Sequence, residues 1–553
     1  MPTVKELLRS GRKDELWQMC CGFLDLNIEQ FMSIQKRLML EQIELLNNSA
    51  IGKKIFKGTM PQNIEEFRRR APLTTYKDYC PELSEKREDA LPVKPLYWQH
   101  TSGRSVEYPF KWESIKWMPI TPGFSRELGI LAAAYTMFAT CSKKHDTSGI
   151  KYGLKFIYAV APRPYTSGTL AYIAAQELGG VSLPALELAE KMSFEERIAA
   201  SLKLAANKGF DLFFGITVAL VAIGERISQQ VGKVSIISML SPPRALFRFA
   251  RGIIRSKIAR RKLLPKDIWS LKGVICTGTD AEIFGQLIKD TWGKYPLNMF
   301  GSTEAGYIAS QTWDYGTMTF NPSMNFLEFI PESEYEKCQQ DKSYVPACYT
   351  LDEVKVGEKY ELVISNFHGG PMIRYHTGDA IKITALSNNK LGIHLPQMEF
   401  VGRVDDRLDI GGFVRLTEKV IWQAISDTGV PYVDWAARKE NGILHVFIEL
   451  RNTEYTDADK IAKLIYVELK KMDDDYMYGN MEDVLHTMPI KVTLLPEGAF
   501  TNYINLRRAQ GADLAHLKPR HLNPSDKEIA VLRMTAAEEV KIEPIKVGVP
   551  AGS

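Results

Sequence analysis

Two short segments in the second half of the chain carry side chains suited to binding a nucleotide. Residues 373–379 read Ile-Arg-Tyr-His-Thr-Gly-Asp, and residues 400–406 read Phe-Val-Gly-Arg-Val-Asp-Asp. A carboxylate such as Asp379 can accept hydrogen bonds from both hydroxyl groups of a ribose, and the guanidinium of Arg403 can bind a phosphate through two donors. Taken singly, the first segment is also typical of an ordinary turn, and Arg403 of a surface ion pair. Their order and proximity favour one shared site.

Three further loops combine small, hydroxyl-bearing and charged residues. Residues 300–306 read Phe-Gly-Ser-Thr-Glu-Ala-Gly, residues 101–105 read Thr-Ser-Gly-Arg-Ser, and residues 276–279 read Cys-Thr-Gly-Thr. The first loop is also typical of a strand-to-helix turn, with Ser or Thr as the N-cap and Glu304 in the first helical turn. The third loop is almost as typical of a plain glycine turn.

Length and composition are those of an ordinary multidomain globular protein. The chain has 553 residues, 45% hydrophobic and 25% charged, with a net charge of +4. We therefore expect roughly two to four domains and no nucleic-acid partner. The seven cysteines form no Cys-x-x-Cys pair and no histidines cluster at ligand spacing, which indicates a reduced, cytoplasmic protein without a structural metal. No signal peptide is visible, and the longest apolar runs are too short to span a bilayer.

Hydrophobic periodicity predicts a mixed α/β fold. Apolar residues recur at helical spacing between Leu24 and Leu38, which predicts a helical N-terminal region. Between about 125 and 300, helical patterns alternate with short β-branched runs, which favours a largely parallel sheet, and 316–415 is rich in strands.

A smaller unit follows the large one. It mixes strand patterns with an amphipathic helix near 457–472. We predict a large N-terminal domain at 1–402, a small C-terminal domain at 403–522, and a tail at 523–553 in which charged residues and prolines favour poor order.

Together the motifs resemble the adenylate-forming superfamily of acyl-CoA synthetases, luciferases and nonribosomal-peptide adenylation domains. Within it, the chain is most similar to the auxin-responsive family of acyl acid amido synthetases and its bacterial relatives, over nearly its whole length. The motifs that carry the resemblance are those at 67–76, 101–105, 300–304, 374–379, 402–406 and 517–520.

The resemblance implies a large, multi-subdomain adenylate-forming α/β domain, a small mobile α+β domain, and a site for ATP and Mg²⁺. Glu304 would hold Mg²⁺, which prefers hard oxygen ligands and usually takes one or two carboxylates plus phosphate oxygens. Asp379 would hold the ribose, and Arg403 the ribose or the α-phosphate. The remaining nucleotide-binding residues implied are Ser102, Gly103 and Ser105 in the phosphate loop, Thr277 and Phe300 near the adenine, and Gly301, Ser302 and Thr303 in the loop that precedes Glu304.

Two positions in the predicted C-terminal domain are implied in the same way. Asp405 matches the hinge about which the small domain of the family swings between two half-reactions. Lys518 matches a lysine of the mobile domain that stabilises negative charge as it passes between the substrate carboxylate and the α-phosphate. The alternative for Lys518 is one exposed lysine among many.

The phosphate loop departs from the family pattern. Arg104, Val106 and Glu107 stand where small residues are usual, and Phe110 stands where a lysine is common. Like charges about 4 Å apart repel by about 1 kcal/mol in water and by more near a protein surface. Glu107 beside a triphosphate therefore requires an offsetting cation such as Arg104 or Lys111, and a non-catalytic nucleotide-binding protein stays an alternative.

The resemblance implies an ATP-dependent ligase that converts a small-molecule carboxylic acid to an acyl-AMP and then passes the acyl group to an amine, usually of an amino acid. The alternative acceptor is the CoA thiol, because the segment 403–412 is also similar to the hinge of CoA ligases. Its paired glycines, Gly411 and Gly412, would allow a pantetheine arm to approach closely.

One segment stands apart from this site. Residues 244–262 are strongly basic, with Leu246, Phe247, Phe249, Ile253 and Ile254 interleaved. Such a segment can rest on an anionic membrane surface or steer an anionic substrate. A solvated helix face is the favoured interpretation.

Overall fold

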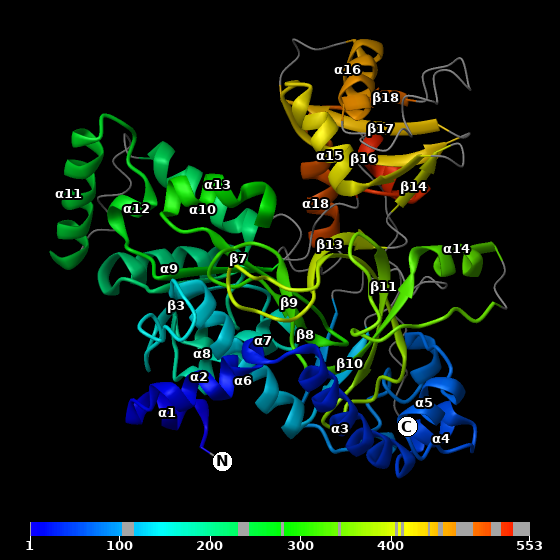
Figure 1. Ribbon diagram of the computed structural model, residues 1–553. Coiled ribbons are helices and arrows are strands. Elements are labelled where there is room, and N and C mark those ends of the chain that lie inside the picture. Colours follow the sequence, from blue (N-terminus) through cyan, green and yellow to red (C-terminus); the bar gives the residue numbers. More distant parts are fainter. Residues whose placement is uncertain are drawn as a thin grey trace, which may run out of the picture. The chain divides into compact units, whose positions relative to one another are not determined.

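The chain divides into two compact units, Met1–Asp405 and Asp406–Ser553 (Figure 1). The sequence placed this boundary between 402 and 403. The computed structural model describes residues 2–101, 116–230, 243–277, 281–340, 344–403, 407–410, 414–440, 443–451, 457–471, 490–509 and 521–534.

The first unit is built on an 11-stranded mixed sheet. In spatial order its strands are β10 (Asn325–Pro331), β11 (Lys359–Asn366), β12 (Tyr375–Ala385), β13 (Gln397–Arg403), β9 (Met318–Phe320), β8 (Gly306–Ser310), β7 (Pro296–Ser302), β6 (Gly273–Thr277), β5 (Leu212–Ile216), β3 (Lys155–Ala159) and β4 (Val181–Leu183). The strands from β7 to β4 pair in parallel and the others are antiparallel. The predicted parallel region and the strand-rich region after 316 are both confirmed.

Helices cover both faces of the parallel half, which is why its strands read as continuous apolar runs. Phe156 and Tyr158 of β3 pack with α6 (Pro122–Thr140) and α7 (Thr166–Leu178) on one face. Ile157 and Ala159 point the other way, because successive strand residues alternate in direction. On that second face lie α9 (Phe194–Lys208), α10 (Thr217–Gln230) and α13 (Ala281–Trp292).

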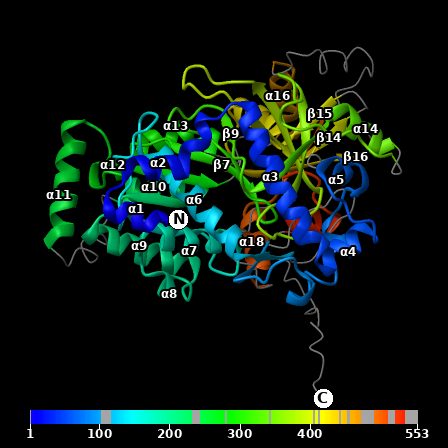
Figure 2. The ribbon, with the colours of Figure 1, turned by 60° about the horizontal axis from the view of Figure 1, so that its bottom comes forward.

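The N-terminal region is helical, as its spacing predicts. The segments are α1 (Val4–Ser10), α2 (Lys13–Cys21), η1 (Gly22–Asp25), α3 (Ile28–Asn47), α4 (Ala50–Phe56) and α5 (Ile64–Arg70). Helix α3 starts at the Asn27 cap, whose side chain accepts from the Gln30 N–H. Its buried Gln35 and Gln42 bond to backbone groups of the strand and loop segments around Asn325 and Gly370, so this helix is fixed to the antiparallel half of the sheet (Figure 2).

Short elements complete the first unit. They are η2 (Tyr76–Tyr79), η3 (Glu88–Ala90), the hairpin β1 (Tyr97–His100) with β2 (Trp117–Ile120), α8 (Leu186–Ala189), α11 (Pro243–Ile258), α12 (Pro265–Ile268) and α14 (Glu332–Gln340).

The second unit has its own hydrophobic core. A three-stranded sheet of β16 (Tyr432–Glu440), β17 (Ile443–Leu450) and β18 (Ile490–Leu494) accompanies the hairpin of β14 (Arg407–Ile410) and β15 (Val414–Thr417) and the helices α15 (Glu418–Asp427), α16 (Ala458–Lys471), α18 (Ala499–Ala509) and α19 (Asp526–Arg533). Helix α16 confirms the amphipathic helix expected near 457–472. Part of the segment treated as a tail is ordered, since Ile529 and Leu532 of α19 pack on Phe447 and Phe500.

No helix among the described residues combines the length and apolarity needed to cross a membrane. The apolar run 128–142 is accounted for by the buried helix α6.

A buried ion pair joins the end of α5 to the sheet. The Arg374 guanidinium contacts both carboxylate oxygens of Glu328 on β10, at 2.9 and 3.1 Å. Its remaining donor reaches the carbonyl oxygens of Arg68 and Ala71 at the end of α5, at 2.8 and 3.0 Å. Those carbonyls have no partner within the helix, so Arg374 caps α5 while neutralising Glu328. Arg374, named in the first motif above, therefore serves the fold.

We expect Arg374→Met to lower the free energy of unfolding by about 3–5 kcal/mol, because the Glu328 carboxylate would stay buried without its principal cation. The double variant Arg374→Met/Glu328→Leu should recover part of this loss in urea unfolding. As a control, Arg37→Met breaks an exposed pair with Glu41 and should cost less than about 1 kcal/mol. Equal losses in the single and double variants would contradict the assigned role.

Candidate active site

A buried polar cluster lies where the loop after β7 meets the start of β12. The Glu304 Oε1 atom is 3.2 Å from the Lys116 ammonium and accepts a hydrogen bond of 3.1 Å from the Tyr375 hydroxyl. The ammonium also donates to that hydroxyl, at 3.2 Å. All three side chains are buried, although they come from segments far apart in the sequence.

The cluster keeps a carboxylate charged inside the protein. Burial by itself would raise the pKa of Glu304. The Lys116 ammonium, the backbone N–H of Glu304 and the hydrogen bonds from Lys116 and Tyr375 outweigh that effect and hold the pKa below its ordinary value. Glu304 is therefore ionised at neutral pH, with a cation already beside it.

The turn that presents Glu304 is a β-hairpin. The Ser302 Oγ accepts from the Ala305 N–H at 3.1 Å, and the next element is β8, so the strand-to-helix turn considered as the alternative does not form. A Cβ added at Gly301 would lie 2.2 Å from the Gly306 carbonyl oxygen, so this close approach requires glycine. Thr303 is held by a hydrogen bond of 2.8 Å between its hydroxyl and that of Thr166.

Phe300 and Phe400 form the aromatic part of the site. Their ring centroids are 5.1 Å apart, although β8 and β9 separate their strands in the sheet. In a flat sheet β7 and β13 would lie roughly 14 Å apart, so the sheet must curl to bring the rings together. Thr277 ends β6 beside β7, with its Cα paired to Met299, at the carboxyl edge of the parallel strands where ligands of α/β sheets bind.

The structure brings the two motifs of the second half into register. Asp379 on β12 is the direct pairing partner of Arg403 on β13. The Asp379 N–H donates to the Thr377 hydroxyl at 3.1 Å, and that hydroxyl donates to the Leu362 carbonyl at 2.7 Å. Gly378 between them has a φ of 70°, a left-handed conformation that favours glycine. Strand β12 therefore carries Tyr375 of the carboxylate cluster and the ribose candidate Asp379.

Several expected site residues lie outside the described residues. These are Ser102, Gly103, Ser105 and Lys518, together with Arg104, Glu107 and Asp405. The described ends of the phosphate loop meet, since the Thr101 N–H donates to the Lys116 carbonyl at 3.1 Å. Lys116 thus stands at the base of this loop.

Lys116 and Tyr375 were missed by the sequence interpretation. The cation of the loop was sought at Arg104 and Lys111, whereas the buried ammonium comes from Lys116, immediately before the apolar strand β2. The sequence offered one signal, a single lysine directly before an apolar strand. A lysine buried at such a junction must be paired with an anion, so an acidic partner could have been sought.

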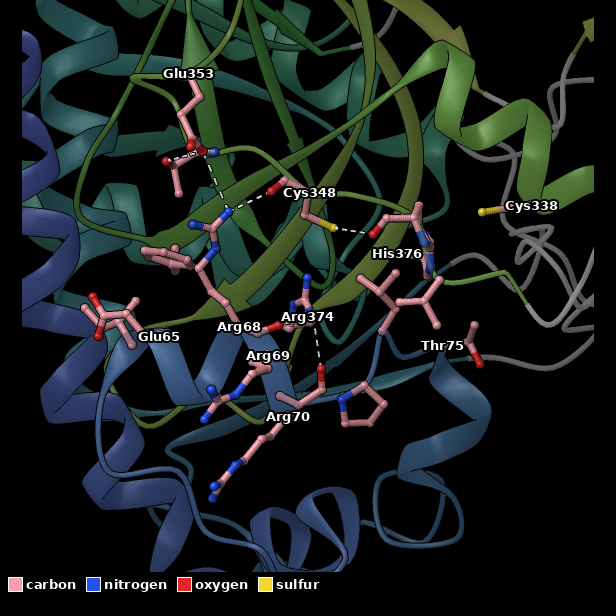
Figure 3. Close-up of a pocket in the computed structure, with 18 of the residues that line it drawn as sticks. Glu65, Arg68, Arg69, Arg70, Thr75, Cys338, Cys348, Glu353, Arg374 and His376 are labelled. Carbon is pink, nitrogen blue, oxygen red and sulfur yellow. Dashed lines mark hydrogen bonds and ion pairs between the residues drawn. The ribbon is translucent and has the colours of Figure 1, made fainter.

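A cavity of about 1090 Å³ lies on the other face of β12 (Figure 3). His376 lines it, whereas its neighbour Tyr375 points to Glu304, as the alternation of strand residues requires. The lining includes Arg69 and Arg70 as well as Glu65 and Glu353. Charges of both signs line this cavity, and it is separate from the Glu304 cluster.

Solved structures share the fold of this chain. A structural match covers 94% of this chain and 95% of the acyl acid amido synthetase AtGH3.15 in complex with 2,4-DB, with a TM-score of 0.63 and 14% identity. A second covers 92% of both chains for 2-hydroxyisobutyryl-CoA ligase in the postadenylation state, with a TM-score of 0.61 and 14% identity. These similarities confirm the predicted fold, that of the adenylate-forming enzymes.

Sequence comparisons support the resemblance over part of the chain. Residues 318–403, from β9 to the end of β13, match the GH3 family central domain. The chain is 23% identical over 239 residues to the indole-3-acetic acid-amido synthetase GH3.15 of Arabidopsis thaliana, and 26% identical over 232 residues to the jasmonoyl–L-amino acid synthetase JAR4 of Nicotiana attenuata. Each alignment covers 40% of this chain, and 38% and 37% of the respective relatives. These matches support the resemblance to the acyl acid amido synthetases that was stated from the motifs.

In the second unit, His521 anchors the chain just after the segment that contains Lys518. Its ring nitrogens face the Glu418 Oε1 at 2.6 Å and the Asp434 Oδ1 at 2.8 Å, so both nitrogens must donate and the ring is an imidazolium. The ring stacks on Trp435 with centroids 4.7 Å apart. The Ala437 N–H donates to the His521 carbonyl and the Asn523 N–H donates to the Ala437 carbonyl, so residues 521–523 pair with the edge of β16.

Burial by itself would lower the pKa of His521, but hydrogen bonds and charge from Asp434 and Glu418 raise it to about 10. A raised pKa stabilises the fold fully below the ordinary value of about 6.5 and loses this contribution as pH rises through about 10. We expect the unfolding free energy of the second unit to fall by a few kcal/mol over that interval.

His521→Gln should flatten this pH dependence in urea unfolding. His394→Gln changes an exposed imidazole of the first unit and should leave the pH dependence unchanged. A second unit whose stability is equally pH-dependent with and without His521 would contradict the imidazolium assignment.

Proposed function

We propose that this protein is an ATP-dependent ligase that forms an acyl-AMP from a carboxylic acid and then transfers the acyl group to the amine of an amino acid. The observation that carries the proposal is the buried, ionised Glu304 held by Lys116 and Tyr375. Tyr375 lies on the same strand as Asp379, which pairs with Arg403. The amine is favoured over the CoA thiol because the relatives described above are named an indole-3-acetic acid-amido synthetase and a jasmonoyl–L-amino acid synthetase.

In this proposal, residues at the ends of different strands bind different parts of the nucleotide. Phe300 and Thr277 take the adenine, and Asp379 takes the ribose with help from Arg403. Ser302 accepts a hydrogen bond from the Ala305 N–H, so its own hydroxyl proton is available to an anionic oxygen. Thr303, Ser102, Gly103 and Ser105 complete the phosphate contacts.

Glu304 offers Mg²⁺ one hard oxygen ligand, and this fits an ion that completes its coordination with the phosphate oxygens of ATP. Among the described residues, no group of three or more Asp, Glu, His or Cys side chains is placed to hold a metal, so the phosphates would have to supply the other ligands. Bound there, the ion would neutralise charge on the phosphates. Lys116 would then release Glu304 and turn its ammonium to a phosphate oxygen.

The reaction places distinct demands on the residues. An oxygen of the substrate carboxylate attacks the α-phosphorus, and the bond to pyrophosphate breaks. Lys116 and Lys518 stabilise the negative charge that develops on the phosphoryl oxygens. In the second step the amine attacks the carbonyl carbon, the bond to AMP breaks, and the amine loses a proton to the solvent.

An apolar cavity of about 50 Å³ between the sheet and α6–α7 is the candidate for the apolar end of the acid. Phe214 and Met299 line it from the sheet, and Ala132, Ala171 and Ala175 line it from the helices. The small alanine side chains leave the space, and the lining favours a compact apolar group over a charged one.

Pyrophosphate exchange into ATP with a panel of carboxylic acids tests the first step. We expect exchange with at least one compact apolar acid. Product analysis by mass, with amino acids and CoA offered together, should give an amide. A thioester product would overturn the choice of amine, and ATP binding without exchange for any acid would favour the non-catalytic alternative.

Glu304→Gln should lower exchange by about 10²-fold or more and raise the Mg²⁺ concentration needed for half-maximal rate, because the charged ligand is lost. Lys116→Met should lower exchange by a similar factor, whereas Lys116→Arg should retain part of it. Glu82→Gln, which removes the charge of a pair with Lys54 away from the site, is the control. Unchanged exchange in a folded Glu304→Gln protein would refute the role of this carboxylate.

A further inference from the structure

Helix α11 (Pro243–Ile258) presents its large apolar side chains to solvent. Phe247 is 69% exposed, Ile254 59% and Ile258 77%. Leu246 and Ile253 are exposed as well. An ordinary surface helix turns such residues toward the protein core, so the orientation of this helix is inverted.

The opposite side of α11 holds it to the protein through small residues. Its buried residues are Ala245, Gly252 and Ser256. They are seven and four residues apart, which places them on one face of the helix. A Cβ added at Gly252 would lie 3.2 Å from Leu263 and 3.3 Å from Ile268. The helix therefore lies close to the segment of α12, and this contact leaves the bulky residues facing outward.

A stripe of arginines borders the exposed apolar face. Arg244, Arg248, Arg251 and Arg255 are spaced by four, three and four residues, which places them along one side of the helix. Lys257 adds a further positive charge in the last turn, Arg260, Arg261 and Lys262 extend it beyond the end of the helix, and no acidic residue occurs between 243 and 266. The acidic residue that follows, Asp267, is paired with Arg261 at 2.7 Å.

The helix lies at the outer edge of the first unit in both views (Figures 1 and 2). Because α11 packs on the protein through its side of small residues, its apolar face and the bordering arginines can meet a flat surface. Positive charge of this density repels a second copy of the same helix and attracts an anionic surface.

We propose that α11 is an interfacial helix that binds an anionic lipid bilayer. Phe247, Ile254 and Ile258 insert at the boundary between the headgroups and the acyl chains, and the arginine stripe contacts the anionic headgroups. This surface is separate from the Glu304 cluster, and the inference does not depend on the proposed function. It replaces the solvated helix face favoured from the sequence.

Flotation of the full-length protein with lipid vesicles tests the proposal. We expect binding to phosphatidylcholine vesicles that contain about one third phosphatidylserine, and at least tenfold weaker binding to phosphatidylcholine alone. Raising the salt from about 0.05 to about 0.5 M should weaken binding to the anionic vesicles, because it screens the arginine stripe.

Two variants separate the apolar and the charged contributions. Phe247→Ser/Ile254→Ser should lower vesicle binding at least tenfold, and Arg244→Gln/Arg255→Gln should remove the preference for anionic lipid. Leu40→Ser is the control, since Leu40 on α3 is exposed to the same degree as Leu246, 48% against 49%. It should bind vesicles like the unmodified protein.

Absence of binding to any vesicle, or equal binding to neutral and anionic vesicles, would overturn the proposal. A dimer in size-exclusion chromatography that dissociates in Phe247→Ser/Ile254→Ser, without vesicle binding, would assign this face to a second copy of the chain. Pyrophosphate exchange in solution should be unchanged in both double variants.

Discussion

The requirement that a buried carboxylate have a cation beside it organises the candidate site. Glu304 lies at the tip of a hairpin, and its charge is maintained by Lys116, which stands at the base of the loop 102–115. Tyr375 completes the cluster from β12. Because removing the Glu304 carboxylate from water is costly without these partners, the hairpin, the loop base and β12 must come together for any one of them to hold its position.

A second buried ion pair lies just before the first residue of β12, and it stabilises the fold. Arg374 neutralises Glu328 and caps the end of α5, so the position of α5 depends on an ion pair one residue away from the site cluster. On the strand itself, Tyr375 faces Glu304 and His376 bonds to Glu361. Neighbouring residues of this stretch therefore face opposite sides of the sheet. Arg374 stabilises the fold, whereas Tyr375 belongs to the site, so a change in the position of β12 would affect both.

Much of the architecture could be predicted because it depends on local patterns. Alternating helical and β-branched segments predicted the parallel sheet, and the order of short motifs predicted the resemblance to the family and one shared site for Asp379 and Arg403. Lys116 could not be found in this way, because its partner Glu304 is distant in sequence and a single lysine has no periodicity. The orientation of α11 was also beyond reach, since amphipathic spacing identifies an apolar face without showing which side the rest of the protein covers.

The sequence by itself determined the class of fold, the division into a large and a small unit, and the residue types available for nucleotide binding, because these follow from composition, spacing and motif order. Only the tertiary structure decided which charges are buried together. It assigned Arg374 to the fold and Lys116 to the carboxylate cluster, and it left the large apolar side chains of α11 exposed. The physical reason is that the environment of a charge depends on the groups around it in space, and these come from segments that the sequence separates by hundreds of residues, as with Lys116 and Tyr375.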